Sequence, residues 1–445
     1  MKGIFVTLRN IYKIEDLRNR ILTTLGLILI YRLGSYVVLP GIDPVILEES
    51  NRGAQGGLTG LLDMFAGGAF SRSSIFALGI MPYISSSIVI QLLGVAIPYF
   101  QKLQKEGESG RRKINQITRL LTILITLGQA PGYLVSQVPN EAIIGGPSFF
   151  FNITSIIILT TGTMFVMWLG EKITDKGIGN GISLIIMIGI ISRLPFSFAA
   201  EFFSRLEEQG GGLVLFLVEM VMLLLVIVAT ILLVQGSRRV PVQFAKRVVG
   251  NRQFGGVRQY IPLKVNAAGV MPIIFAQAIM FVPLTLAGFS DSNSLQGFFA
   301  AFTDFTGFWY NFAFFVMIIM FTYFYTAITV NPNQMADDMK RNGGFIPGVK
   351  PGKQTADFLD SVMSRITLPG SMFLAVVAIL PAFAMIGGVN SQFAQFYGGT
   401  SLLIMVGVVL DTLQQIESHL LMRHYDGLMK SGRIKGRSSI SMATQ

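Results

Sequence analysis

The stretch from Gly56 to Pro98, GGLTGLLDMFAGGAFSRSSIFALGIMPYISSSIVIQLLGVAIP, decides how the rest of the chain is interpreted. Its first half, Leu58 to Phe70, is apolar and rich in glycine, but at about 1.5 Å per helical residue it is too short to cross a hydrocarbon core of about 30 Å. The second half, Ile75 to Leu93, is long enough to span, but Pro82 lies inside it and removes a backbone hydrogen-bond donor. Irregular backbone at membrane depth persists only where protein buries it or where it lines a cavity. We therefore expect a short re-entrant helix and an interrupted span beside a pathway through the bilayer.

The composition is typical of a protein that crosses the membrane many times. Of the 445 residues, 51% are hydrophobic and 13% are charged, whereas about a quarter of the residues of a soluble domain are charged. The chain has no cysteine, which excludes thiol chemistry, iron–sulfur clusters and disulfides. Its two histidines lie near the C-terminus, and no H-E-x-x-H, G-x-S-x-G or Walker A motif occurs. We expect no enzymatic activity, no cofactor and no metal.

Ten apolar windows have spanning length. They are Ile21–Leu39, Ile75–Leu93, Ile117–Val135, Phe149–Leu169, Ile182–Phe198, Leu213–Val234, Val265–Leu286, Phe308–Val330, Ile366–Ile386 and Leu402–Leu421. The predicted fold class is therefore an all-α polytopic membrane protein with ten transmembrane helices. An even number of spans places both chain ends on one side.

The positive charges indicate which side that is. Of the 35 Lys and Arg residues, 30 lie in the two termini and in alternate loops, and such residues collect on the cytoplasmic side. Both termini are predicted to be cytoplasmic, with residues 1–20 as an amphipathic helix and 422–445 as a tail. The loops 235–264 and 331–365 are long and basic, which favours docking surfaces for anionic lipid or an RNA-rich particle. The alternating VPVQFA run in the first of them predicts a strand.

A short repeat relates the two parts of the chain. Gly79–Ile84, GIMPYI, matches Gly269–Ile274, GVMPII, and each lies in the second span of a group of five. Five spans between the copies reverse their direction, so the pattern predicts two inverted, pseudo-symmetric halves, 21–202 and 213–421, joined by a hinge at 203–212. The working site is expected at the interface between the halves.

Branched aliphatic side chains flank the interruptions. Ile80 and Ile84 are one helical turn apart, as are Ile186 and Ile190, and Ile274 takes the repeat position in the seventh span. Such pairs commonly serve as packing or lipid-facing surface. Beside broken helices, however, a ring of stiff side chains can exclude water and ions without selecting a solute.

Polar residues on neighbouring spans form a second pattern, comprising Ser85, Ser86, Ser87, Gln91, Gln129, Asn266 and Gln277. We expect the serines to bond carbonyls of the preceding turn, whereas the amides need partners across a helix seam. At about 0.6–1.7 kcal/mol for each bond, such a seam can open at modest cost.

Two carboxylates and one glycine run have simpler interpretations. Glu219 is expected to reach the membrane interface, and Asp411, near the middle of the tenth span, should have a partner or water. For Asp411 we favour structural pairing over a proton relay. The GIGNG run, Gly177–Gly181, predicts a tight turn between the fourth and fifth spans, because no strand precedes it as in a phosphate loop.

With these residues assembled, the chain resembles the SecY/Sec61-alpha family of protein-conducting channels over nearly its whole length. The resemblance is carried by MFAGGAFSRSSIFALGIMPYISSSIVIQLL, GIGNGIS, PLKVNAAGVMP, NPNQMADDMK, PGVKPGKQTADFL and FYGGTSLLI, in this order. It implies an hourglass pore between two halves, a plug at 58–70 that seals the resting channel, and a lateral gate between the second and seventh spans.

The resemblance also implies roles for individual residues. The plug would include Leu58, Leu61, Leu62, Met64, Phe65 and Phe70, and the pore ring would comprise Ile80, Ile84, Ile186, Ile190, Ile274 and Ile404, the last identified by resemblance alone. The lateral gate would include Ser87, Gln91, Gln129, Asn266 and Gln277. Motor and ribosome docking would use Lys246, Arg247, Arg252 and Lys350. Lys350 stands where bacterial relatives usually have arginine, so it keeps the charge but lacks the planar fork for bidentate contacts.

The function implied is a passive, gated channel that passes unfolded polypeptides across, and releases membrane segments into, the bacterial cytoplasmic membrane. Its implied partners are SecE and SecG-type small subunits, the SecA ATPase motor, the ribosome, signal sequences with nascent chains, and membrane lipid, but no DNA. The alternative is an inverted-repeat secondary transporter for a small solute. That class requires convergent polar or ionisable groups at the midplane, which are missing from the sequence around the breaks.

Overall fold

The computed structural model is mostly helical, and it describes residues 14–51, 60, 63–206, 212–244, 247–249, 252–254, 258–277, 279–280 and 305–430. Most of the predicted N-terminal helix, the hinge residues 207–211 and the last part of the predicted tail lie outside the described residues. The same holds for Leu58, Leu61, Leu62 and Lys246 of the predicted functional set.

The first half of the chain consists of helices joined by short connections. They are α2 (Glu15–Gly34), α3 (Pro44–Asn51), α5 (Met81–Ala96), α6 (Pro98–Lys105), α7 (Glu108–Gln137), the 3-10 helix η1 (Asn140–Ala142), α8 (Phe149–Lys176) and α9 (Gly181–Leu206). The predicted GIGNG turn is confirmed: α8 ends at Lys176, α9 begins at Gly181, and Gly179 between them has a φ of 81°. Neighbouring helices pack in sequence, with α7 against α5 and α8, and α8 against α2 and α9.

The second half contains α10 (Gly212–Gln235), a helix over 271–277, α13 (Phe308–Thr329), α14 (Pro332–Arg341), α15 (Lys353–Ile386), α16 (Ser391–Ala394), the 3-10 helix η2 (Gln395–Tyr397) and α17 (Gly399–Lys430). The predicted strand over VPVQFA is confirmed as β1 (Ser237–Phe244), which pairs antiparallel with β4 (Arg258–Lys264) in the register Val240↔Ile261. On its other side β1 pairs with β5 (Gly344–Phe345) of the second basic loop. One three-stranded sheet therefore joins the two basic loops.

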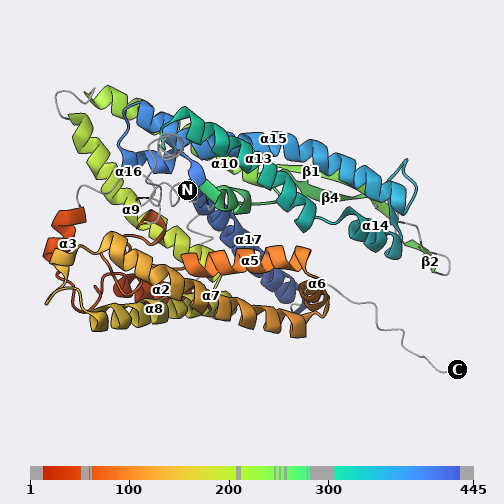
Figure 1. Ribbon diagram of the computed structural model, residues 1–445. Coiled ribbons are helices and arrows are strands. Elements are labelled where there is room, and N and C mark those ends of the chain that lie inside the picture. The colour runs from red at the N-terminus through yellow and green to blue at the C-terminus, as the bar shows by residue number, and fades with distance from the viewer. Residues whose placement is uncertain are drawn as a thin grey trace.

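The two halves form two layers (Figure 1). Helices α2, α5, α7 and α8 lie in one layer, α10, α13 and α15 lie in the other, and α17 runs between them. The last helix contacts α9 of the first half as well as α10 and α15 of the second. The largest apolar core cluster also draws residues from both halves, including Tyr31, Ile80, Ile190, Phe393 and Ile404. The interface between the halves is thus the main core of the molecule.

Six described helical stretches are long and apolar enough to cross a membrane: α8, α9, α10, α13 continued by α14, α15 and α17 up to Leu420. The pair α5 and α6, bent by 101°, would be a seventh. Two further predicted spans overlap α2, of 20 residues, and α7, of 30 residues, which are not among these stretches. The predicted span Val265–Leu286 is described as helix over 271–277 and 279–280. The chain is a multi-pass membrane protein.

The predicted position of Pro82 in mid-helix is wrong. Residues 75–80 form turns, α5 begins only at Met81, and Pro82 occupies the first turn of the helix, where its missing N–H leaves no intrahelical hydrogen bond unmade. The two copies of the predicted repeat have similar backbone conformations. Gly79 has a φ of 54° and Gly269 has a φ of 63°, and a helix begins two residues after each glycine. Glycine suits both positions because it adopts positive φ without steric cost.

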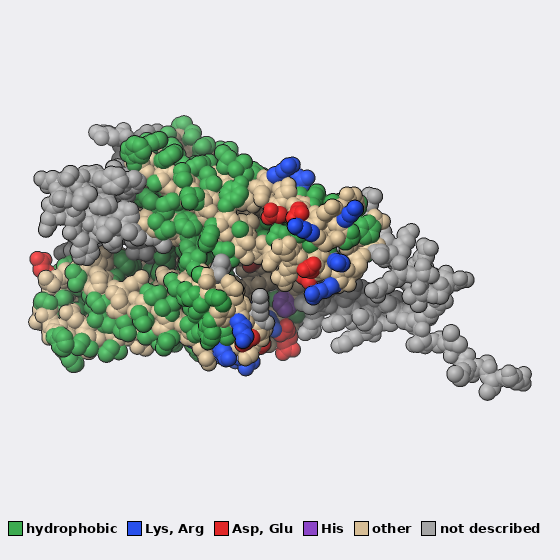
Figure 2. Space-filling model, turned by 45° about the vertical axis from the view of Figure 1, so that its right-hand side comes forward, with side chains coloured by type: hydrophobic (Ala, Val, Ile, Leu, Met, Phe, Trp, Pro, Cys, Tyr) green, Lys and Arg blue, Asp and Glu red, His purple; other side chains and the backbone are tan. Residues whose placement is uncertain are grey.

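Charged and apolar side chains are separated on the surface. In Figure 2 the hydrophobic side chains cover most of the face shown, and most Lys, Arg, Asp and Glu side chains gather toward the end that carries the β1–β4 sheet in Figure 1. We call this the basic end. Helix α10 exposes a run of large apolar residues, including Leu217, Val221, Leu224 and Leu225, as expected for a helix that faces lipid.

Candidate functional site

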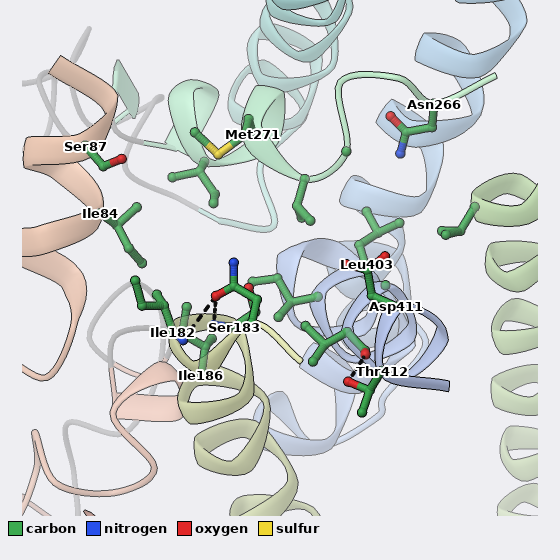
Figure 3. A pocket seen from close by; sticks show the side chains of 18 of the residues that line it. Ile84, Ser87, Ile182, Ser183, Ile186, Asn266, Met271, Leu403, Asp411 and Thr412 are labelled. Carbon is green, nitrogen blue, oxygen red and sulfur yellow. Dashed lines mark hydrogen bonds between the residues drawn. The ribbon is translucent and has the colours of Figure 1, made fainter. Parts of the chain in front are cut away.

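A cavity of about 500 Å³ lies at the interface between the halves (Figure 3). Its walls come from α5, from α9, from residues 264–274 and from α17. Polar residues from the basic end, including Asn180, Lys264, Asp411 and Thr412, line one part of it. Ile84, Ile186, Ile274 and Ile404 line it as well, so four of the six predicted isoleucines share one space.

The other two predicted isoleucines lie beside these four. Ile80 and Ile190 are buried and belong to the same apolar cluster as Ile186 and Ile404, with Ile84 packed against it. We call the six residues the isoleucine cluster. They come from α5 and its N-cap, α9, helix 271–277 and α17. None of the six is exposed, and four of them form an apolar part of the cavity wall.

A compact segment, residues 63–70, packs beside the isoleucine cluster. It is helical over residues 63–65 and then forms turns. Met64 and Phe65 are buried in the cluster that contains Ile80 and Ile190, and Phe70 is buried in a second cluster of the first half. Tyr133 of α7 stacks edge-on against Phe70 at 4.9 Å and donates a hydrogen bond of 2.6 Å to its carbonyl. The predicted plug residues in the described part therefore touch both the isoleucines and the wall.

The predicted gate residues fall into two groups. Ser87, Gln91 and Asn266 line the cavity. Gln277 instead accepts a hydrogen bond of 3.3 Å from Thr400 of α17, within the second half, and does not bridge the seam. Gln129 is exposed on α7, with no hydrogen bond to another described residue. As expected, Ser85 and Ser86 donate to the carbonyls of Met81 and Pro82. The Ser87 hydroxyl instead accepts a hydrogen bond of 3.5 Å from the Gln91 amide.

One gate contact was missed by the sequence analysis. The hydroxyl of Tyr325 on α13 donates to Oε1 of Gln91 on α5, at 3.3 Å, which joins the two halves. The ring of Tyr325 also packs against Phe275 of helix 271–277, with centroids 6.3 Å apart. The only signal in the sequence was that the Gln91 amide needs a hydrogen-bond partner, and this did not identify Tyr325 as the donor.

A buried charge cluster at the end of α9 corrects the expectation for Glu219. Its carboxylate does not reach the membrane interface but accepts a hydrogen bond of 2.5 Å from Arg205, which also pairs with Glu201 at 2.8 Å. Arg205 donates to the carbonyl of Gly388 at 2.6 Å as well. Burial raises the pKa of Tyr397, which stays protonated and donates to the Glu219 carbonyl. The cluster ties the end of α9 to the second half.

The structural pairing favoured for Asp411 is not found among the described residues. Asp411 lies exposed on the cavity wall and has no described ion pair. Asp411 and Lys264 are charged side chains among the residues that line this cavity.

The described members of the predicted docking set lie at the basic end. Arg247 and Arg252 fall on the short paired strands β2 (Arg247–Val249) and β3 (Arg252–Phe254). Lys350 is exposed in the second basic loop, where its carbonyl accepts a hydrogen bond of 2.9 Å from the Thr355 hydroxyl. The shared sheet holds both loops in one body.

Two inverted groups of helices enclose a half-polar cavity, and a docked segment packs against the apolar cluster beside that cavity. This arrangement defines a gated membrane channel. The chain belongs to the SecY family, whose model matches residues 74–413. It is 43% identical to the protein translocase subunit SecY of Mycobacterium bovis over 93% of this chain and 97% of that protein. It is 42% identical to the same subunit of Streptomyces coelicolor over 94% of this chain and 98% of that protein.

Solved structures have the same fold. A structure described as a protein conducting channel covers 90% of this chain and 92% of its own, with a TM-score of 0.59 and 16% identity. Sec61 from a canine ribosome–channel complex of the endoplasmic reticulum matches with a TM-score of 0.56, 15% identity and the same coverage of both chains.

Proposed function

We propose that this chain forms the protein-conducting channel of a Sec translocase, which passes unfolded polypeptides across the membrane and releases apolar segments sideways into lipid. The observation that carries this function is the cavity between the halves, which is polar toward the basic end and is lined by four residues of the isoleucine cluster. The family membership and the 43% identity to a translocase subunit support it.

In this proposal the isoleucine cluster is the pore ring. Aliphatic side chains bind neither water nor ions well, so a narrow apolar waist resists ion flow by dewetting. It also offers no hydrogen bonds that would select one passing sequence over another. Residues 58–70 are then the plug, and their described part, 63–70, is docked against the ring in the closed state.

The seam between α5 and helix 271–277, with α13 beside it, is the proposed lateral gate. A signal helix entering this seam would bury its apolar side chains there. A ligand shifts a two-state equilibrium only by its preference for one state, and a shift from 1:99 to 99:1 takes about 5.5 kcal/mol. Burial at about 25 cal/mol per Å² supplies that from a few hundred Å² of apolar surface.

The channel itself performs no chemistry in this proposal and is driven by partners. The basic end, with Lys350 and the strands that carry Arg247 and Arg252, would receive the ribosome or the SecA motor. One solved relative with this fold is described in a ribosome–channel complex. SecE and SecG-type subunits would cover outer helices, and the membrane would be the bacterial cytoplasmic membrane with both termini cytoplasmic.

The alternative, a secondary transporter for a small solute, is not favoured. Among the residues that line the cavity, Lys264 and Asp411 are the ionisable side chains apart from Tyr83. Most of the remaining lining is aliphatic, small or amide. A transporter of this kind would place several convergent polar groups at the breaks.

Planar bilayers provide the test. Deletion of residues 60–70 from the full chain is expected to raise resting ion conductance, because the ring would lose its docked cover. Unchanged conductance would contradict the assignment of this segment as a plug. Uptake of a small solute down its gradient into vesicles, without conductance, would support the transporter instead.

A further inference from the structure

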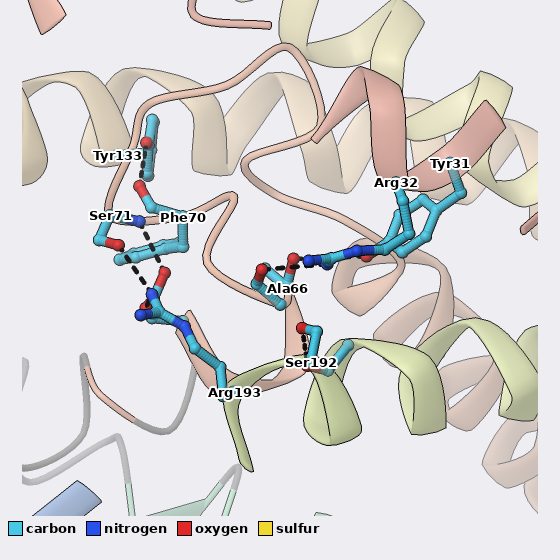
Figure 4. A network of polar contacts seen from close by, with 11 residues as sticks. Tyr31, Arg32, Ala66, Phe70, Ser71, Tyr133, Ser192 and Arg193 are labelled. Atoms are coloured by element: carbon cyan, nitrogen blue, oxygen red, sulfur yellow. Dashed lines mark hydrogen bonds and ion pairs between the residues drawn. The ribbon is translucent and has the colours of Figure 1, made fainter. Parts of the chain in front are cut away.

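The plug is tied to the channel wall by one pair of opposite charges. Asp63 lies at the start of the segment, and its carboxylate forms an ion pair with the guanidinium of Arg193 on α9. Figure 4 shows Arg193 extending from α9 toward Ser71 at the other end of the segment. The two side chains are 14% and 23% exposed, so the pair is shielded from most of the solvent. A charge pair in such surroundings is screened less than one at the surface.

The plug backbone closes around this pair. The second carboxylate oxygen of Asp63 accepts a hydrogen bond of 2.8 Å from the Ser71 N–H, and Arg193 also donates to the Ser71 hydroxyl at 3.1 Å. Gly68, with a φ of 89°, passes so close that an added Cβ would lie 3.0 Å from the Arg193 guanidinium. Arg193 therefore holds both ends of the segment from Asp63 to Ser71.

The other polar contacts of the plug with the wall use neutral backbone groups. Arg32 of α2 donates to the Gly67 carbonyl at 3.1 Å, and the Tyr31 hydroxyl donates to the Ala66 carbonyl at 3.4 Å. Arg72, just beyond the plug, lies over the Tyr36 ring at 4.3 Å. Three arginines thus surround the plug, and among the described contacts only Arg193 has a carboxylate partner on it.

We propose that the Asp63–Arg193 pair is the latch that holds the plug closed. The inference rests on the proposed channel function and names the two residues that position its plug. Displacement of the plug from α9 separates the charges and leaves Arg193 near Arg32 without its counter-ion. The pair therefore favours the closed channel, and removal of either partner shifts the balance toward the displaced plug.

The absence of native cysteine provides a direct readout. In the full chain, Met64→Cys places a single thiol at a buried plug position, where it reacts with a membrane-impermeant maleimide only when the plug is displaced. Labelling rate and resting conductance in planar bilayers are measured for Asp63→Asn, Arg193→Gln and the double variant, each with Met64→Cys. Arg72→Gln is the matched control, because it also removes one positive charge beside the plug.

Each single variant is expected to raise the labelling rate and the resting conductance about tenfold each, as for the loss of one hydrogen bond to a charged group. The double variant should do no more than the stronger single, because the two side chains act through one interaction. Arg72→Gln should stay near the parent. The proposal is overturned if the single variants have the labelling rate and conductance of the parent, or if the effects of the two single changes multiply in the double variant. It is also overturned if Arg72→Gln raises labelling and conductance as much as Arg193→Gln does.

Two further comparisons keep the result decisive. If a single variant accumulates poorly, the double variant Asp63→Arg with Arg193→Asp restores the pair with reversed charges. This double variant should be labelled more slowly than Asp63→Arg or Arg193→Asp alone. Equal or faster labelling of the double variant rejects the latch. Deletion of residues 60–70 separates the two levels. If the deletion raises conductance and the latch variants do not, the latch proposal is wrong and the channel proposal is kept. If the deletion leaves conductance unchanged, the assignment of this segment as the plug is rejected.

Discussion

Tyr325 of α13 links the second half to the first across the seam proposed as the lateral gate. Its hydroxyl reaches Gln91 across the seam and its ring contacts Phe275. The interaction combines one hydrogen bond with ring packing, so it can be broken without leaving a buried charge. This is the kind of contact a gate requires, because it must form again after each substrate.

Tyr325→Phe is expected to favour the open gate. The change removes the hydroxyl and keeps the ring, and one such hydrogen bond contributes about 0.5–1.5 kcal/mol, or roughly a two- to tenfold change in the open-to-closed ratio. Labelling of Ser87→Cys by a lipid-soluble maleimide measures that ratio. Tyr323→Phe is the matched control on the same helix, since its hydroxyl bonds the Ser364 carbonyl of the same half; an equal effect of both changes would remove Tyr325 from the gate.

Single residues were predictable where a local pattern or a resemblance marks them. The repeat and the helical spacing indicate five of the six isoleucines, and all six meet between the halves. The Asp63–Arg193 pair was not predicted, because its members are 130 residues apart in the chain and no spacing rule relates them. The available signal was an arginine inside a predicted span, which needs a partner.

The elements follow the hydropathy closely, but their ends depend on packing. Proline is tolerated in the first turn of a helix but interrupts a helix when it lies in the middle. The sequence therefore could not distinguish an interrupted helix from one that begins at Met81. The close approach of α8 to the turn at 75–80 was equally hidden. A Cβ added to Gly162 on α8 would lie 2.0 Å from the Ile75 carbonyl oxygen.

Gly162→Ala is therefore expected to destabilise the first half by pushing α8 away from the turn before α5. Overpacking of this kind typically costs about 1–3 kcal/mol, seen as a lower melting temperature in detergent. Gly128→Ala on α7 is the matched control, because its Cβ would meet nothing within 4 Å, and it should be neutral or slightly stabilising through helix propensity. Equal melting temperatures for the two variants would contradict the close contact.

At the scale of the whole molecule, the halves are joined by more than the covalent connection. Arg205 binds Glu201, Glu219 and the Gly388 carbonyl, so the end of α9, the start of α10 and the α15–α16 connection meet at one buried point. The sequence suggested a glycine-rich hinge here but gave no reason to expect a clamp beside it. The clamp limits the directions in which the halves can separate.

Arg205→Ala should loosen this junction. It leaves two buried carboxylates without their cation, and removal of one partner of a buried pair typically costs about 3–5 kcal/mol. Thermal unfolding in detergent measures the loss. Arg119→Ala, which breaks a more exposed pair with Glu171, should cost less than about 1 kcal/mol; comparable losses in the two variants would show that the cluster at Arg205 is not a clamp.

The central claim is that polypeptide passes between the two halves, through the isoleucine cluster. Site-specific photo-crosslinking from Ile84 and Ile274 to a stalled secretory chain tests it most directly, with Leu120 on the outer face of α7, 69% exposed, as the control position. The account predicts strong crosslinks from Ile84 and Ile274 and few from Leu120. Crosslinks that are absent from both isoleucine positions, or equally strong from Leu120, would contradict it.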